Sequence, residues 1–188
     1  HLSVVDFVKA CLKKYKLRFT VVDRHHLRTT APYDLVITIG GDGTVLRTSH
    51  LVSDTPVLGV NSFPKTSTGF FCAATRRTFE RWLTSILEGK VLPKPINRLE
   101  VLIDGKPVKE LVLNEMLFAS SMVAATSKYI LKVGRGREEQ RSSGVWITTA
   151  AGSTAVIKSA GGRVLPVLSD KIQYLVREPC PGRKKRFK

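Results

Sequence analysis

The chain has 188 residues, of which 43% are hydrophobic and 24% are charged. This composition is ordinary for a globular protein, so it excludes a disordered or collagen-like chain, and the length allows one large domain or two small ones. Lysine and arginine number 31 against 15 acidic residues, which gives a net charge of +16. Such a surface attracts anions such as nucleotides, but no DNA- or RNA-binding motif accompanies it, so we expect no specific nucleic-acid partner. The apolar runs are far shorter than the roughly 20 residues of a membrane span, and we expect no membrane association.

The three cysteines, Cys11, Cys72 and Cys180, are odd in number and far apart in the chain. This usage indicates a reducing compartment, so we expect a cytoplasmic protein without a disulfide framework. Histidines and cysteines lack metal-ligand spacing, and no metal site is predicted. Because the chain begins at His1 and ends in a basic stretch at 182–188, we interpret it as a fragment, incomplete at both ends, with an atypical tail.

Helices and strands alternate in the first half of the chain. Apolar side chains at helical spacing predict helices at 2–15 and 76–88, the second ended by Gly89. Short branched runs predict strands at 17–22, 34–39 and 56–60, with a polar loop at 24–32 and a helix at 44–52. The run 34–39 is typical of a strand buried on both faces of a parallel sheet. Residues 1–94 therefore predict an α/β, Rossmann-like nucleotide-binding domain.

Short strands dominate the second half. Asp104-Gly105 is a hairpin turn signal between the β-prone runs 98–103 and 108–113. Further β-prone runs lie at 116–119, 129–133 and 145–149. We place a domain boundary at Pro93–Pro95, so that residues 95–188 form a β-rich second domain.

The sharpest local motif is Gly40-Gly41-Asp42-Gly43-Thr44, which lies between a predicted buried strand and a predicted helix. We expect its glycines to adopt positive φ angles and to let a phosphate approach the main-chain amides at the helix start. The motif is neither a Walker A loop nor the GxGxxG fingerprint. A carboxylate among phosphates suggests a proton acceptor or a metal contact, which phosphoryl transfer requires. The structural alternative is a tight turn in which Asp42 caps the helix.

Two further clusters lie in the second half. Asn114-Glu115 follows the apolar run 111–113, and an amide beside a carboxylate can bind ribose hydroxyls or the adenine edge; the alternative is a solvated strand end. The segment 148–155 and its continuation to 159–162 contain mostly small residues, several with hydroxyls. Small side chains permit close contact with a flat ligand, and hydroxyls supply hydrogen bonds. Close packing of a strand on a helix is the other interpretation.

Taken in this order, the three clusters resemble the NAD kinase family. That family has a GGDGT motif, an Asn-Glu pair, and a GSTA loop followed by Ser-Ala-Gly-Gly. They stand here as Gly40–Thr44, Asn114-Glu115, Gly152–Ala155 and Ser159–Gly162. Gly59-Val-Asn61 and Thr68-Gly-Phe70 are similar to two further segments of the family. The chain most resembles the divergent plant-type NADH kinases.

The resemblance implies ATP-dependent phosphorylation of the adenosine ribose 2′-hydroxyl of NADH or NAD to give NADP(H), with Mg²⁺ as part of the ATP complex. It implies that Asp42 is the base or the hydroxyl-orienting group. It also implies nucleotide-binding roles: Gly41, Gly43 and Thr44 for phosphates, Asn114 and Glu115 for ribose or adenine, Ser153, Thr154 and Ala155 for the dinucleotide pocket, and in addition Asn61 and Phe70. Family members are usually homo-oligomers, so we expect a homo-oligomer whose partners are small-molecule nucleotides.

Several positions depart from the family pattern Ser-Thr-Pro-Thr-Gly-Ser-Thr-Ala-Tyr. Ala150 replaces the proline, Ala151 the threonine and Val156 the tyrosine, while Ser143 stands where an aspartate is common. The plant-type NADH kinases tolerate such changes, which favours NADH over NAD. Two alternatives stay open: a lipid kinase of the diacylglycerol or sphingosine type, which shares GGDGT, and a catalytically inactive nucleotide-binding relic. The GSTA loop favours the NAD kinase.

Overall fold

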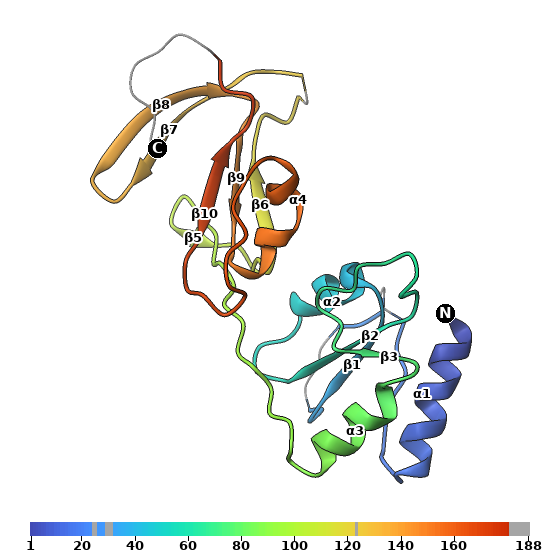
Figure 1. The fold of residues 1–188 in the computed structure, drawn as a ribbon. Coiled ribbons are helices and arrows are strands. Elements are labelled where there is room, and N and C mark those ends of the chain that lie inside the picture. Colours follow the sequence, from blue (N-terminus) through green and yellow to red (C-terminus); the bar gives the residue numbers. More distant parts are fainter. Residues whose placement is uncertain (24–25, 29–31, 123, 181–188) are drawn as a thin grey trace. The chain divides into compact units, whose positions relative to one another are not determined.

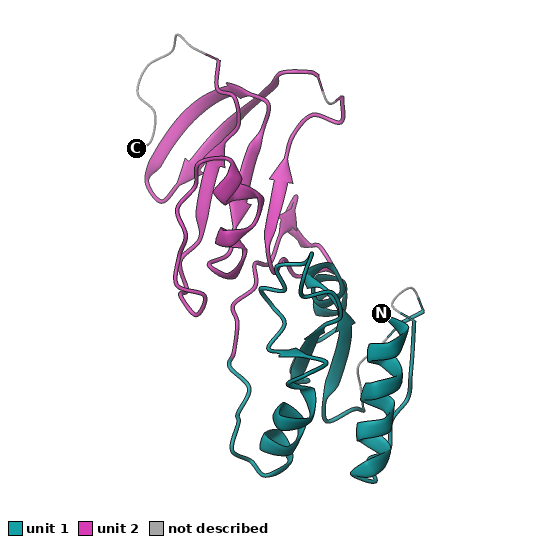
Figure 2. Ribbon diagram, turned by 45° about the vertical axis from the view of Figure 1, so that its right-hand side comes forward, with its two compact units in different colours: residues 1–94 teal, residues 95–188 magenta. Residues whose placement is uncertain are grey.

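The computed structural model describes residues 1–23, 26–28, 32–122 and 124–180. The chain divides into two compact units, His1–Lys94 and Pro95–Lys188 (Figure 2). The division falls inside the stretch 93–95, where the sequence changes from alternating helices and strands to short strands. The basic tail 182–188 and part of the predicted loop 24–32 lie outside the described residues.

Unit 1 has the mixed α/β content that the sequence predicts. Its helices are α1 (Leu2–Lys14), α2 (Asp42–Ser49) and α3 (Phe79–Leu87), and its strands are β1 (Val36–Gly40), β2 (Val57–Asn61) and β3 (Ala74–Thr75) (Figure 1). The strands are parallel, in the order β1-β2-β3, with Val36 opposite Val57 and Val60 opposite Ala74. Because α2 follows β1 directly, the glycine motif lies at the carboxyl end of β1.

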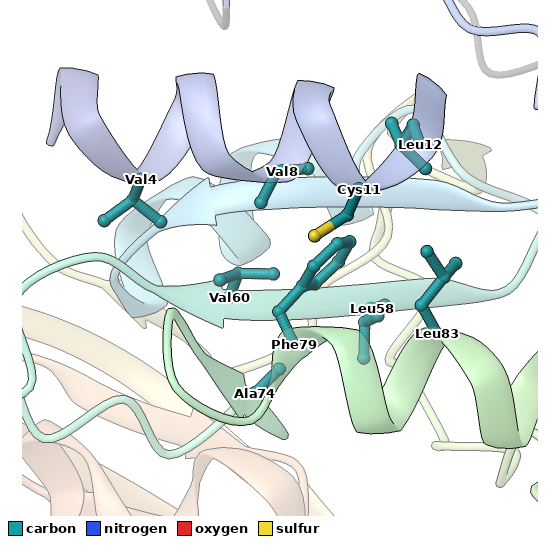
Figure 3. Packing of buried hydrophobic residues seen from close by; sticks show 9 residues of the cluster. All are labelled: Val4, Val8, Cys11, Leu12, Leu58, Val60, Ala74, Phe79 and Leu83. Atoms are coloured by element: carbon teal, nitrogen blue, oxygen red, sulfur yellow. The ribbon is translucent and has the colours of Figure 1, made fainter. Parts of the chain in front are cut away.

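The core of unit 1 forms where α1 and α3 pack against β2 (Figure 3). Apolar residues recur along one face of α1 at helical spacing, and Phe79 and Leu83 lie one turn apart on α3. The buried set is Val4, Val8, Cys11, Leu12, Leu58, Val60, Ala74, Phe79 and Leu83. Each large side chain of this kind stabilises the fold by about 1.5–3 kcal/mol when fully buried.

Three expectations for unit 1 are corrected. The run 17–22 is not a strand; Leu17 and Phe19 pack against the core instead, so their apolar character reflects burial rather than strand pairing. The helix predicted at 44–52 begins at Asp42, with Gly43 inside its first turn. The helix predicted at 76–88 begins at Phe79, because the hydroxyl of Thr78 accepts a hydrogen bond from the Thr75 amide and closes a local turn first.

Unit 2 is built largely from antiparallel strands. They are β4 (Leu102–Ile103), β5 (Lys106–Pro107), β6 (Glu115–Phe118), β7 (Ser127–Val133), β8 (Gly136–Ser142), β9 (Val145–Thr148) and β10 (Gln173–Val176). One sheet has the order β10-β9-β6, and β7 pairs with β8 as β4 pairs with β5. The short helix η1 (Ala151–Thr154) and α4 (Val156–Ser159) follow β9. In the part of the chain that the structure describes, no helix has the length and apolar character needed to cross a membrane.

The predicted hairpin is present but more irregular than expected. Asp104 and Gly105 both have positive φ angles, 50° and 75°, as a tight two-residue hairpin turn requires. The paired strands β4 and β5 have two residues each, and the antiparallel pairing resumes only at Leu99 and Val112. The sequence reading missed β8, because the side chains that β8 buries on one face are polar: Glu138, Gln140 and Ser142.

Candidate functional site

The glycine motif forms a tight turn from β1 into α2. Gly41 is the N-cap of α2 in an extended conformation, with φ −113° and ψ −165°. The expected positive φ angles are absent at Gly40, Gly41 and Gly43. Glycine is needed here for space instead: a Cβ at Gly40 would overlap the Thr44 side chain, and one at Gly41 would lie 2.8 Å from the Ser67 hydroxyl. A Cβ at Gly43 would meet nothing within 4 Å, so the turn is open there.

Asp42 connects this turn to the loop that follows β2. Its Oδ1 accepts a hydrogen bond from the Phe71 amide at 2.8 Å, and its Oδ2 accepts one from the Phe70 amide at 3.0 Å. The carboxylate therefore holds the loop against the start of α2, and it does not cap the helix, because Gly41 is the N-cap and no side-chain capping hydrogen bond is present there. Since a carboxylate has about four acceptor positions, these two bonds leave room for contact with a substrate hydroxyl. The catalytic role of Asp42 stays a prediction.

Asn61 and Phe70 belong to the same loop system. Asn61 is buried; its Oδ1 accepts from the Phe63 amide at 3.0 Å, and its Nδ2 donates to the Ser67 carbonyl at 3.2 Å. Gly69 has a φ of 60°, and a Cβ there would overlap the Asn61 amide. Asn61 thus shapes the loop. Phe70 is 43% exposed, so a flat ligand has access to this residue.

In unit 2, the structure brings Asn114 and the turn 151–155 together. Gly152 packs directly on the backbone of Asn114, whose carbonyl a Cβ at Gly152 would overlap. The Thr149 amide and the Thr148 hydroxyl both donate to that carbonyl, at 3.0 and 2.9 Å. The two sequence clusters, separated by more than thirty residues, therefore form one local structure.

Two acceptor atoms beside this turn of unit 2 have no donor among the described residues. Asn114 Oδ1 and Glu115 Oε2 are buried and have no hydrogen-bond partner among the described residues. Burial also raises the pKa of the Glu115 carboxyl. Leaving a buried acceptor unpaired costs about 1–3 kcal/mol, so each of these two acceptors is suited to a ligand that donates O–H groups. A ribose diol is such a ligand.

The predicted pocket residues of the turn differ in their surroundings. Ser153 is fully buried, its hydroxyl donates to the Ala150 carbonyl at 2.6 Å, and the Leu165 amide donates to it at 2.8 Å. The Ser153 side chain therefore supports the turn. Thr154 and Ala155 are half-buried and lie at the end of η1, where a ligand has access to them.

The predicted residues thus form two groups, each within its own unit. Gly41, Asp42, Gly43, Thr44, Asn61 and Phe70 surround the turn of unit 1, and Asn114, Glu115, Ser153, Thr154 and Ala155 surround the turn of unit 2. The sequence did not indicate the roles of two further residues. The hydroxyl of Ser67 lies beside Gly41, and the hydroxyl of Thr149 donates to the Leu113 carbonyl. Thr149 lies in the small-residue run, but its hydrogen bonds depend on long-range contacts.

Within the described ranges, His, Cys, Asp and Glu side chains form no group of three or more that would hold a metal ion. Burial, followed by the nearby charge of Asp42, raises the pKa of Cys72 to about 11. Its thiol therefore stays protonated at neutral pH and is a poor nucleophile.

Comparison with known proteins identifies relatives of the chain. Residues 8–91 match the family described as the ATP-NAD kinase N-terminal domain. The probable NADH kinase of Oryza sativa subsp. japonica is 35% identical, and the NADH kinase of Arabidopsis thaliana is 38% identical; each match covers 97% of this chain. The chain is a relative of the NAD kinases. The resemblance inferred from GGDGT, Asn-Glu and GSTA is confirmed, and this chain spans 63% and 65% of the length of the two plant NADH kinases.

Solved NAD kinase structures share the fold. The NAD kinase of Archaeoglobus fulgidus, in complex with ATP, aligns with a TM-score of 0.76 and 24% identity over 96% of this chain and 70% of its own. The yeast NADH kinase, complexed with NADH, aligns with a TM-score of 0.65 and 22% identity over 82% of this chain and 46% of its own. At these identities the likeness to NAD kinases concerns the fold alone.

Proposed function

We propose that this chain carries the substrate-binding and catalytic residues of an NAD(H) kinase. The reaction transfers the γ-phosphoryl group of ATP to the 2′-hydroxyl of the adenosine ribose of NADH or NAD. A bond forms between the ribose oxygen and phosphorus, the bond to the ADP oxygen breaks, and the hydroxyl proton leaves. Mg²⁺ enters with ATP, as part of the substrate.

One observation carries the proposal: Asn114 Oδ1 and Glu115 Oε2 are buried acceptors, beside a turn of small residues, for which the described part of the chain offers no donor. The two hydroxyls of a ribose supply the missing donors, and the small, half-buried Ala155 leaves space for a flat base. In unit 1, the open side of Gly43 and the amides at the start of α2 suit phosphate groups. By the family resemblance, Asp42 is the residue that orients the attacking hydroxyl or accepts its proton.

The plant relatives and the residue changes together favour NADH as the acceptor. Both plant proteins reported above are named as NADH kinases. In this chain Ala150, Ala151 and Val156 form a smaller and less polar turn than the Pro, Thr and Tyr of the usual pattern. The matched family favours a nucleotide acceptor over the lipid acceptor of a diacylglycerol- or sphingosine-type kinase.

An assay of the purified chain with ATP and Mg²⁺ tests this function. NAD, NADH and a diacylglycerol are offered in separate reactions, and NADP(H) or phosphorylated lipid is measured. We expect NADPH from NADH at a higher rate than NADP from NAD. Lipid product alone would establish the lipid kinase, and NADH binding without any product would establish a catalytically inactive nucleotide-binding protein.

Three further properties belong to this proposal. A Rossmann-like arrangement of unit 1 is supported by its parallel strands and the turn from β1 into α2. A cytoplasmic location is supported by the free state of Cys11, Cys72 and Cys180. A homo-oligomer rests on the family resemblance, and light scattering coupled to size-exclusion chromatography measures it.

Glu115→Gln should separate stability from binding. Burial raises the pKa of Glu115, so the folded protein favours the protonated carboxyl. The stability that the protonated carboxyl contributes is lost as the pH rises through the raised pKa. The variant should therefore melt at a higher temperature than the parent at neutral pH. Its advantage should vanish below about pH 4, where even an unperturbed glutamate is protonated.

The same variant should bind NADH more weakly at neutral pH, because a charged acceptor for a ribose hydroxyl becomes a neutral one. Thermal denaturation across pH and NADH titration measure the two effects. An equal or lower melting temperature at neutral pH would contradict the inferred cost of burying this carboxylate. Glu110→Gln, an exposed change in the same unit, is the matched control.

A further inference from the structure

Thr149 stands at the second position of the pattern Ser-Thr-Pro-Thr-Gly-Ser-Thr-Ala-Tyr, and none of the roles that the family resemblance implies above falls on it. It follows β9, is 2% exposed, and its hydroxyl makes two hydrogen bonds. Oγ1 donates to the Leu113 carbonyl at 2.5 Å and accepts from the Gly152 amide at 2.9 Å. Leu113 directly precedes Asn114, and Gly152 directly precedes Ser153. One hydroxyl therefore joins the two segments that carry the candidate binding residues of unit 2.

The backbone of the same residue strengthens this connection. The Thr149 amide donates to the Asn114 carbonyl at 3.0 Å. Thr149 thus donates hydrogen bonds to the carbonyls of Leu113 and Asn114, and it accepts one from the Gly152 amide at the start of the turn. Changing its side chain leaves the amide bond in place, so the contribution of the hydroxyl is separable by mutation.

Asn114 needs such external support. Its side-chain oxygen has no hydrogen-bond partner among the described residues, so that oxygen does not hold the side chain in place. The direction of the amide then depends on where the backbone of residues 113 and 114 lies. A small shift matters, because a hydrogen bond weakens steeply when its angle and distance leave their narrow range.

We propose that Thr149 is a positioning residue that sets the affinity for the dinucleotide by fixing Asn114 against the turn 151–155. The inference rests on the proposed function. Threonine suits the role because its branched Cβ restricts χ1 and its hydroxyl both donates and accepts. Valine has the same shape but would leave the Leu113 carbonyl and the Gly152 amide unpaired in a buried place.

Thr149→Val and Thr149→Ser, made in the full chain, test the proposal. We expect Thr149→Val to raise the Kd for NADH, measured from NADH fluorescence, by about tenfold or more. Its KM for NADH should rise in step, while its KM for ATP stays near that of the parent. Thr149→Ser keeps the hydroxyl and should restore the NADH Kd to within about threefold of the parent.

Thr38→Val is the matched control. Thr38 is 5% exposed on β1, and its hydroxyl has no partner among the described residues, so the change removes a buried hydroxyl without breaking a hydrogen bond to any of them. We expect its NADH Kd to equal that of the parent. Hydrogen exchange at the Gly152 amide adds a readout in the absence of ligand, and we expect faster exchange in Thr149→Val only.

The outcomes separate the two proposals. A Thr149→Val protein with a lowered melting temperature and an unchanged NADH Kd would overturn the positioning role and leave the kinase proposal standing. A Thr149→Ser protein as weak as Thr149→Val would assign the effect to the methyl group and also overturn it. A folded parent chain that binds no NADH would overturn the kinase proposal and this inference together.

Discussion

Asp42→Asn is expected to lower the turnover of NADH by about 100-fold or more, since a positioned acid–base group typically contributes that much. The change removes the charge that would orient or deprotonate the 2′-hydroxyl. It also alters the loop, because both carboxylate oxygens accept main-chain hydrogen bonds, from Phe70 and Phe71. An asparagine can accept only one of them with its oxygen, and its NH₂ group would face the other amide.

Two readouts distinguish these effects. Loss of the carboxylate alone lowers kcat with little change in KM, whereas a loosened loop also raises KM and speeds hydrogen exchange at Phe70 and Phe71. The exposed change Asp6→Asn, on α1 of the same unit, controls for removal of one negative charge. Near-normal kcat in Asp42→Asn would leave the residue with its observed structural role only.

The sequence was sufficient to predict the glycine turn but not how Asp42 is used. A branched run ending in Gly-Gly-Asp-Gly-Thr predicts a strand, a turn and a helix from local preferences, and β1 and α2 confirm it. The donors to Asp42 come from residues 28 and 29 positions away, and no local pattern reports them. The expectation of positive φ angles was wrong for a different reason: these glycines are required by the space that the Thr44 and Ser67 side chains occupy.

In unit 2, the difficulty lies in polar residues that are buried. A short β-prone run revealed β9, but β8 buries Glu138, Gln140 and Ser142, and its polar sequence gave no strand signal. The motif residues Asn114 and Gly152 were predicted individually. Their contact was not, because the sheet register that places Glu115 opposite Thr148 arises from the pairing of β6 with β9.

Gly152→Ala is expected to damage the dinucleotide site of unit 2 more than any other single methyl group. The added Cβ would overlap the carbonyl of Asn114, which is backbone and cannot rotate away. The turn 151–155 must then shift from Asn114, at a cost of about 1–3 kcal/mol for overpacking. If the shifted turn weakens the free energy of NADH binding by that amount, the Kd for NADH rises by about 10- to 100-fold.

Gly134→Ala separates this effect from ordinary backbone strain. Gly134 lies in the turn between β7 and β8 with a φ of 54°, and a Cβ there meets nothing within 4 Å. The control should lower the melting temperature through its left-handed conformation, which costs roughly 1–2 kcal/mol, and leave the NADH Kd unchanged. A Gly152→Ala protein that melts earlier but binds NADH like the control would show that the turn can move from Asn114 without loss of the site. Weakened binding in Gly152→Ala alone would tie NADH affinity to the close contact between the two motifs, because the control shares the loss of stability but not the clash.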